Sequence, residues 1–171
     1  FVGSFVILAL SGAFLLMLPS ATTNGISFTN AIFTATSAVC VTGLAVVDTA
    51  NDFTIIGQSI ILVLIQLGGI GILTFTSFFA FFFRGGSSFK EGLNTKDFIA
   101  TEGLKDVFRA ALNVVVFTIG VEIVGALFIY SSIAGNNAID NKFFFSIFHS
   151  ISAFCNAGFS LFNNSLEGFA T

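Results

Sequence analysis

One segment of this chain occurs twice, and the repeat constrains the fold more than any other feature. The first copy, TATSAVCVTGL, covers residues 34–44, and the second, HSISAFCNAGF, covers residues 149–159. When residues 28–44 are aligned with residues 143–159, seven positions are identical without a gap, and the only two cysteines of the chain coincide. Biased composition is the alternative explanation, but two rare residues in register argue against it. The sequence therefore predicts one supersecondary unit that is used twice.

The composition is that of an integral membrane protein. Hydrophobic residues make up 55% of the 171 residues and charged residues only 9%, with a mean hydropathy of +0.99. Soluble domains carry about 25% charged residues, so this chain has too few to cover a surface that faces water. The net charge of −3, without a basic patch, gives no indication of nucleic-acid binding. The single histidine has no acid–nucleophile cluster beside it, so we expect neither an enzyme nor a bound cofactor.

Three apolar stretches predict helices that cross the membrane, namely residues 1–18, 55–83 and 110–131. A crossing needs about 20 apolar residues. The second stretch corresponds to about 43 Å of helix, which exceeds the hydrocarbon thickness, so we expect tilt or bending. Residues 96–109 are predicted to form a short interfacial helix that leads into the third span.

Two further apolar segments, residues 27–39 and 143–154, are too short to cross. Each would reach only about 16–20 Å as a helix, which favours a re-entrant or buried helix. Their candidate N-cap residues are Ser27 or Thr29 in the first segment and Asp140 or Asn141 in the second.

The basic residues indicate the orientation of the chain. Residues 84–109 contain five of the six lysines and arginines, which marks this segment as cytoplasmic. Both repeated loops are then extracellular and have the same orientation, whereas alternating-access transporters commonly use inverted repeats. We expect a first span, short helix, loop and span unit over residues 1–83. A cytoplasmic connection follows over residues 84–106, and a second unit, which ends after its loop, covers residues 107–171.

The loops CVTGL and CNAGF offer backbone carbonyl groups and almost no ligating side chains. Non-helical backbone at membrane depth survives where it lines water or is buried in protein, and a ring of carbonyls can replace the hydration shell of an alkali cation. The C-terminal partial charge of each short helix would favour a cation there. The candidate ion-binding backbone comprises Cys40, Val41, Thr42, Gly43 and Leu44 in the first loop and Cys155, Asn156, Ala157, Gly158 and Phe159 in the second.

An alkali cation is the expected ion, and its expected ligands are six of those carbonyls. Glycine permits the backbone angles that direct successive carbonyls to one side, and each loop contains one. A filter of this kind takes about four loops, so we expect this sequence to form half of a four-unit pore. The six residues are Val41, Thr42, Gly43, Asn156, Ala157 and Gly158.

Several other polar residues have two interpretations. Acids in the extracellular loops either concentrate cations or belong to ordinary solvated loops; they are Asp48, Asp52, Asp140 and Glu167. Glu122, in the middle of a span, is either functional or hydrogen-bonded between helices. We expect an interhelical hydrogen bond from Gln66, a packing or hydrogen-bonding role for His149, and small buried thiols behind the loops at Cys40 and Cys155.

These loops and their flanks resemble the Trk/Ktr/HKT superfamily of potassium transporters. The resemblance extends over essentially the whole sequence and is strongest in TATSAVCVTGLAVVDT (34–49), QLGGIGILTF (66–75) and FHSISAFCNAGFSL (148–161). It implies an all-α integral membrane protein with tandem parallel span–pore helix–span repeats, similar to a potassium-channel pore, and it makes Gly43 and Gly158 the filter glycines. Plant members that permeate sodium carry serine at the first of these positions, so Gly43 favours potassium over sodium.

The same resemblance implies a function and partners. It implies potassium uptake through a channel-like pore in the plasma membrane, by a multi-pass protein that forms a homodimer. It also implies contact between residues 84–106 and a cytoplasmic ring of nucleotide-binding regulatory subunits. The gating loop and pore-facing arginine of the family belong to units outside this sequence. The alternatives are an ion-coupled secondary transporter that uses re-entrant half-helices, and a membrane scaffold or enzyme subunit without transport activity.

Overall fold

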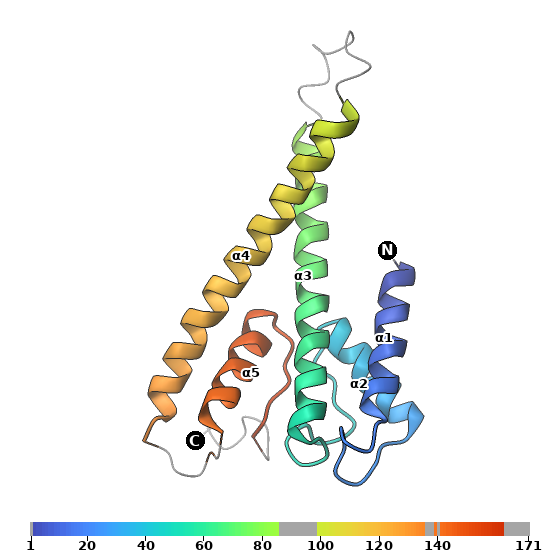
Figure 1. Ribbon diagram of the computed structural model, residues 1–171, viewed down its shortest axis with the longest axis vertical. Coiled ribbons are helices and arrows are strands. Elements are labelled where there is room, and N and C mark those ends of the chain that lie inside the picture. Colours follow the sequence, from blue (N-terminus) through green and yellow to red (C-terminus); the bar gives the residue numbers. More distant parts are fainter. Residues whose placement is uncertain (1, 86–98, 136–138, 140, 163–171) are drawn as a thin grey trace. The chain divides into compact units, whose positions relative to one another are not determined.

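The described part of the chain is entirely helical apart from its connections (Figure 1). The computed structural model describes residues 2–85, 99–135, 139 and 141–162. The helices in this part are α1 (Val2–Leu16), α2 (Phe28–Val39), α3 (Ile55–Gly85), α4 (Ile99–Ile133) and α5 (Lys142–Phe154). For these described residues, the expectation of an all-helical fold is confirmed.

The chain divides into two compact units. The first contains residues 1–69 and 121–171, and the second contains residues 70–120. Helices α3 and α4 each begin in one unit and end in the other. Both repeated loops lie in the first unit. The division of the chain by its repeat, at residues 84–106, stays a prediction, and residues 86–98 of that connection lie outside the described part.

Within the described residues, two helices are long and apolar enough to cross a membrane. These are the segments 55–72 of α3 and 111–133 of α4. Helix α1, where we expect another span, has 15 residues, about 22 Å of helix, which is less than the hydrocarbon thickness of about 30 Å.

Helix α4 corrects one prediction. It runs without a break from Ile99 to Ile133, so residues 99–109 continue into the span and do not form a separate interfacial helix. The reason is local: no proline interrupts this stretch, and charged side chains alone do not end a helix.

The two short helices begin where the sequence predicts. The Ser27 hydroxyl caps α2 by accepting the Asn30 N–H at 3.3 Å, and the Asn141 side chain caps α5 by accepting the Phe144 N–H at 3.1 Å. Each cap satisfies one of the N–H groups that a helix start leaves free. With 12 and 13 residues, the helices reach only about 18–20 Å. They are too short to cross, as predicted.

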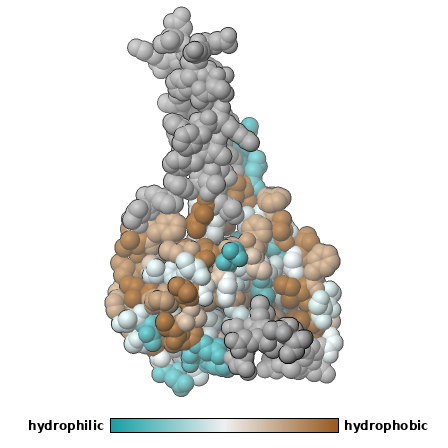
Figure 2. Space-filling model, turned by 180° about the vertical axis from the view of Figure 1, so that it is seen from behind, coloured by the Kyte–Doolittle hydropathy of each residue, from teal (hydrophilic) through white to brown (hydrophobic). Residues whose placement is uncertain are grey.

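Small side chains let the helices of the first unit approach closely. Helix α2 lies beside α1 (Figure 1), and its Ala31, Ala35 and Ala38 are fully buried in a core that includes Ile61 and Ile65 of α3. Such small-residue contacts are typical of helices that pack in lipid. Large hydrophobic side chains are exposed on the outside, and hydrophobic residues cover much of the coloured face in Figure 2. This surface suits a hydrocarbon solvent.

Candidate functional site

The two repeated segments end their short helices with the same backbone hydrogen bonds. At the end of α2, the Thr42 N–H bonds to the Ser37 carbonyl at 3.0 Å, and the Val41 N–H bonds to the Ala38 carbonyl at 3.2 Å. At the end of α5, the residues 115 positions later make the matching bonds at 2.7 and 3.0 Å. This pair of bonds is a Schellman motif, which turns the chain sharply after the helix.

In both loops, the sign of the backbone angle φ then alternates from residue to residue. In the first loop (residues 40–44), φ is 56° at Val41 and 72° at Gly43. In the second loop (residues 155–159), φ is 57° at Asn156 and 73° at Gly158. The intervening residue of each loop keeps the ordinary negative φ. The sequence indicated the glycines but not the positions two residues before them. Asparagine tolerates a positive φ, whereas for a β-branched valine it is an outlier, held here by the Schellman bonds.

The two loops touch each other through their glycines. A Cβ atom added to Gly43 would lie 3.0 Å from the Gly158 Cα, and one added to Gly158 would lie 3.3 Å from the Gly43 Cα. Real Cβ atoms rarely approach so closely. The structure therefore brings together two segments that are 115 residues apart in the chain, with only glycine fitting at their contact.

Helix α3 holds the ends of both short helices at the same level. Gly68 faces the Val39 carbonyl at the end of α2, and a Cβ atom there would overlap that carbonyl. The next residue, Gly69, faces Cys155 at the end of α5, and a Cβ atom would lie 2.6 Å from its Sγ. The glycine pair in QLGGIG thus allows close contact with both segments.

A serine that is identical in the two copies contacts each loop from the helix side. The Thr42 hydroxyl donates to the Ser37 Oγ at 3.1 Å in the first copy. In the second copy, the Ser152 hydroxyl donates to the Phe159 carbonyl at 2.7 Å. The Phe159 carbonyl at the end of the second loop is therefore hydrogen-bonded to α5. The sequence alignment marked these serines as identities, although our expectations gave them no role.

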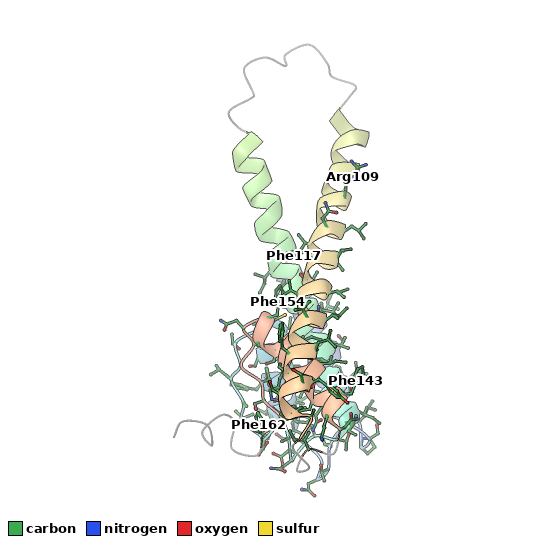
Figure 3. All side chains as sticks on the ribbon, turned by 90° about the vertical axis from the view of Figure 1, so that its left-hand side faces the viewer. Arg109, Phe117, Phe143, Phe154 and Phe162 are labelled. Carbon is green, nitrogen blue, oxygen red and sulfur yellow. The ribbon has the colours of Figure 1, made fainter. Side chains whose placement is uncertain are left out.

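His149 links α5 to the chain after the second loop. Its Nε2 accepts the Leu161 N–H at 3.3 Å, so the proton is on Nδ1, which donates to the Phe145 carbonyl at 2.9 Å. Phe162 lies beside α5 (Figure 3), and its ring centroid is 5.2 Å from that of the imidazole. The expected hydrogen-bonding and packing role of His149 is confirmed.

The two loops differ in how well they are covered. Cys155 is partly buried against α3, whereas Cys40 is exposed, so the prediction of a buried thiol at Cys40 is wrong. At the end of the loops, Leu44 is 60% exposed and Phe159 only 4%. One physical reason is that α3 packs against the second loop, where Gly69 faces Cys155.

Other polar residues predicted from the sequence have local partners. Gln66 Nε2 of α3 donates to Glu122 Oε2 of α4 at 3.0 Å, which confirms the expected interhelical bond. The Asp48 N–H donates to the Asp52 carboxylate at 2.8 Å, so these acids shape their own loop. Asp140 and Glu167 lie outside the described residues. Among the residues that the structure describes, no three His, Cys, Asp or Glu side chains cluster as metal ligands.

Comparison with known proteins places these features in a family. Residues 2–171 match the model of the TrkH family, described as cation transport protein. The chain is 38% identical over 165 residues to the Ktr system potassium uptake protein B of Bacillus subtilis, covering 96% of this chain and 37% of that protein. It is 37% identical over 166 residues to the protein of the same name from Vibrio alginolyticus, covering 97% and 36% respectively.

A third relative carries a different description. The potassium/sodium uptake protein NtpJ of Enterococcus hirae is 36% identical over 164 residues, which are 95% of this chain and 36% of that protein. The chain thus spans little more than a third of the length of these relatives. The family model, in contrast, matches nearly all of the chain. This chain therefore belongs to the TrkH family of cation transport proteins, the Trk/Ktr type that its loops resemble.

Proposed function

We propose that this chain forms part of a channel-like pathway for potassium uptake across the cell membrane. The selectivity filter would be made of backbone carbonyls of the two loops, namely those of Val41, Thr42, Gly43, Asn156, Ala157 and Gly158. The observation that carries the proposal is the shared geometry of the loops, with alternating handedness and with contact at their glycines. The relatives named as potassium uptake proteins support potassium as the ion.

The alternation supports carbonyl coordination because of how peptide groups orient. In an extended strand with negative φ throughout, successive carbonyls point to opposite sides. A residue with positive φ between two with negative φ reverses one peptide group, so that neighbouring carbonyls can face the same way. Both loops contain two such residues in the same positions. A cation that sheds its water needs this kind of oxygen array.

The uncovered side of the first loop supports further units around the same axis. The second loop is flanked by α3 and by the first loop, and Cys155 contacts Gly69. By the symmetry of the repeat, exposed Cys40 would contact the matching helix of another copy. Relatives nearly three times as long as the matched region have room for such copies. We therefore propose tandem parallel span–pore helix–span units, about four in a complete pore.

The remaining assignments of the pathway follow from this proposal. The loops face the extracellular side, and residues 84–106 face the cytoplasm, where a nucleotide-binding regulatory ring would contact a homodimer. Potassium is the cargo, and sodium is the competing cation, because one relative is named a potassium/sodium uptake protein. Glycine at position 43 favours potassium.

A matched set of alanine substitutions in the full-length protein tests the filter. Gly43→Ala and Gly158→Ala each place a side chain at a positive φ in the contact between the loops. Gly25→Ala is the control, because Gly25 also has a positive φ, of 78°, but nothing lies within 4 Å of an added Cβ atom. Left-handed strain, about 1–2 kcal/mol, is therefore common to all three variants.

We expect the two loop variants to lose rubidium uptake in proteoliposomes and to fail to support growth of an uptake-deficient strain at limiting potassium. Gly25→Ala should retain both activities. Membrane yield and size-exclusion profile are measured for all three variants, so that a folding failure is recognised. Loop variants that fold and take up rubidium as well as the control would refute the filter assignment.

A further inference from the structure

The most informative feature outside the two loops is the buried pair formed by Gln66 and Glu122. Glu122 is only 6% exposed, in the apolar middle of the α4 span. It accepts one hydrogen bond, from Gln66 Nε2 to its Oε2 at 3.0 Å. No lysine or arginine of the described residues forms an ion pair with it; Lys142, the basic residue on α5, donates to the Ala134 carbonyl. An unpaired carboxylate in such surroundings is strongly unfavourable.

The pair leaves two buried oxygen atoms without a donor. Within the described part of the chain, neither Gln66 Oε1 nor Glu122 Oε1 has a hydrogen-bond partner. A buried acceptor without a partner is unfavourable, because it has lost its hydrogen bonds to water. Both atoms belong to the two groups that are already joined by the Nε2–Oε2 bond.

A single proton satisfies both oxygens. If Glu122 is a neutral carboxylic acid, its Oε1–H can donate to Gln66 Oε1 while Gln66 Nε2 donates to Glu122 Oε2. The amide and the acid then form a closed pair with two hydrogen bonds, and no acceptor of either side chain lacks a donor. We propose that Glu122 is a proton-binding site. In its neutral form it positions α3 and α4 against the second loop.

The surroundings of the pair explain this positioning role. The Glu122 backbone carbonyl accepts the Ser150 hydroxyl of α5 at 2.7 Å, so one residue of α4 contacts both α3 and α5. Gln66 and Gly69 are three residues apart and share a face of α3. Gly69 contacts Cys155 at the start of the second loop. The acid–amide pair therefore holds in place the face of α3 that contacts the second loop.

The groups around Glu122 do not supply a competing charge. From α5, the uncharged Ser150 hydroxyl donates to the Glu122 backbone carbonyl. Among the described residues, the titratable group near it is the Cys155 thiol of the second loop, and a thiol carries no charge. His149 of α5 is bonded to Phe145 and Leu161 instead. From α3, the neutral Gln66 amide donates a hydrogen bond to the carboxyl group.

Infrared spectroscopy of the full-length protein at neutral pH tests the proton directly. A protonated carboxylic acid has a C=O stretching band that a carboxylate lacks, and solvated carboxyl groups are ionised at this pH. We expect this band in the wild type and its loss in Glu122→Gln. Asp52→Asn is the control, because Asp52 lies in the loop before α3 and accepts a backbone N–H there; its replacement should leave the band unchanged.

Rubidium uptake tests the positioning role. Glutamine at position 122 reproduces both hydrogen bonds of the neutral acid, so Glu122→Gln should retain wild-type uptake. Glu122→Leu leaves the Gln66 amide without a partner and should lower uptake roughly eight-fold, the shift expected from the loss of both interhelical hydrogen bonds of the pair. The exchanged pair, Gln66→Glu with Glu122→Gln, keeps one acid and one amide and should also retain wild-type uptake.

Each result decides the proposal. An acid band that does not differ between the wild type and Glu122→Gln would overturn it, because Glu122 would then be ionised. Loss of uptake in Glu122→Gln as severe as in Glu122→Leu would overturn the positioning role, because a charge would then be required. The infrared result does not depend on ion transport, so failure of the proposed pore and failure of this inference are distinguishable.

Discussion

The contact between Gly69 and Cys155 makes a quantitative prediction about how α3 supports the second loop. In Gly69→Ala, the new Cβ atom would lie 2.6 Å from the Cys155 Sγ and 3.3 Å from its Cβ. Overpacking of this kind costs about 1–3 kcal/mol. In the double variant Gly69→Ala/Cys155→Ala, the sulfur is absent, and the closest of these contacts becomes 3.3 Å, which a shift of a few tenths of an ångström relieves.

The two substitutions should therefore compensate each other. Cys155→Ala alone removes one partly buried sulfur atom and should cost less than the roughly 2–5 kcal/mol of a large core truncation. We expect the double variant to be less destabilised than the sum of the two single-variant losses in unfolding free energy. The difference should be about 1–3 kcal/mol, the cost of the overpacking that is relieved.

The assay is thermal unfolding of the full-length protein in detergent, followed by size-exclusion chromatography, together with rubidium uptake. Gly120→Ala is the control for replacing a helix glycine with alanine, because nothing lies within 4 Å of an added Cβ atom there. Gly69→Ala should have a lower midpoint than Gly120→Ala, and Cys155→Ala should recover it. Additive effects of the two substitutions would show that α3 does not support the loop through this contact.

Three further predictions concern the same region. Gly68→Ala should lower the unfolding midpoint more than Gly69→Ala, and Val39→Ala should not rescue it, because the obstacle is a backbone carbonyl; rescue would contradict this. Ser152→Ala removes the bond to the Phe159 carbonyl, about 1 kcal/mol, and should reduce rubidium uptake at unchanged protein yield; unchanged uptake would show that this bond does not support the loop. Gly43→Ser places a side chain at a φ of 72° and should lower the rubidium-to-sodium uptake ratio, measured by competition; an unchanged ratio would count against the filter.

Local features of the structure followed from the sequence because their causes are local. The limits of the short helices came from cap residues such as Ser27 and Asn141 and from the length of the apolar segments. The repeat predicted that both loops would have equivalent structures, and their matching hydrogen bonds agree with this. Where a local signal was lacking, prediction failed. No stop signal separates residues 99–109 from the α4 span, yet we expected a separate helix there.

Burial and contact between distant residues could not be predicted in this way. The repeat made the two cysteines equivalent, but only packing against α3 makes Cys155 partly buried and leaves Cys40 exposed. The role of Glu122 was open between two interpretations, because hydropathy shows that a carboxyl group lies in a span and not which side chain faces it. Its partner, Gln66, is 56 residues away in the chain.

The sequence by itself determined that this chain is helical, that it belongs in a membrane, and that it uses one loop-bearing unit twice. These properties depend on composition, segment length and spacing, all of which are readable along the chain. The tertiary structure decided that the two glycines meet, that adjacent residues of α3 hold both loops at one level, and that α4 bonds to α3 through a buried acid. Contacts of this kind depend on which helix faces pack together, and no single segment specifies its partner.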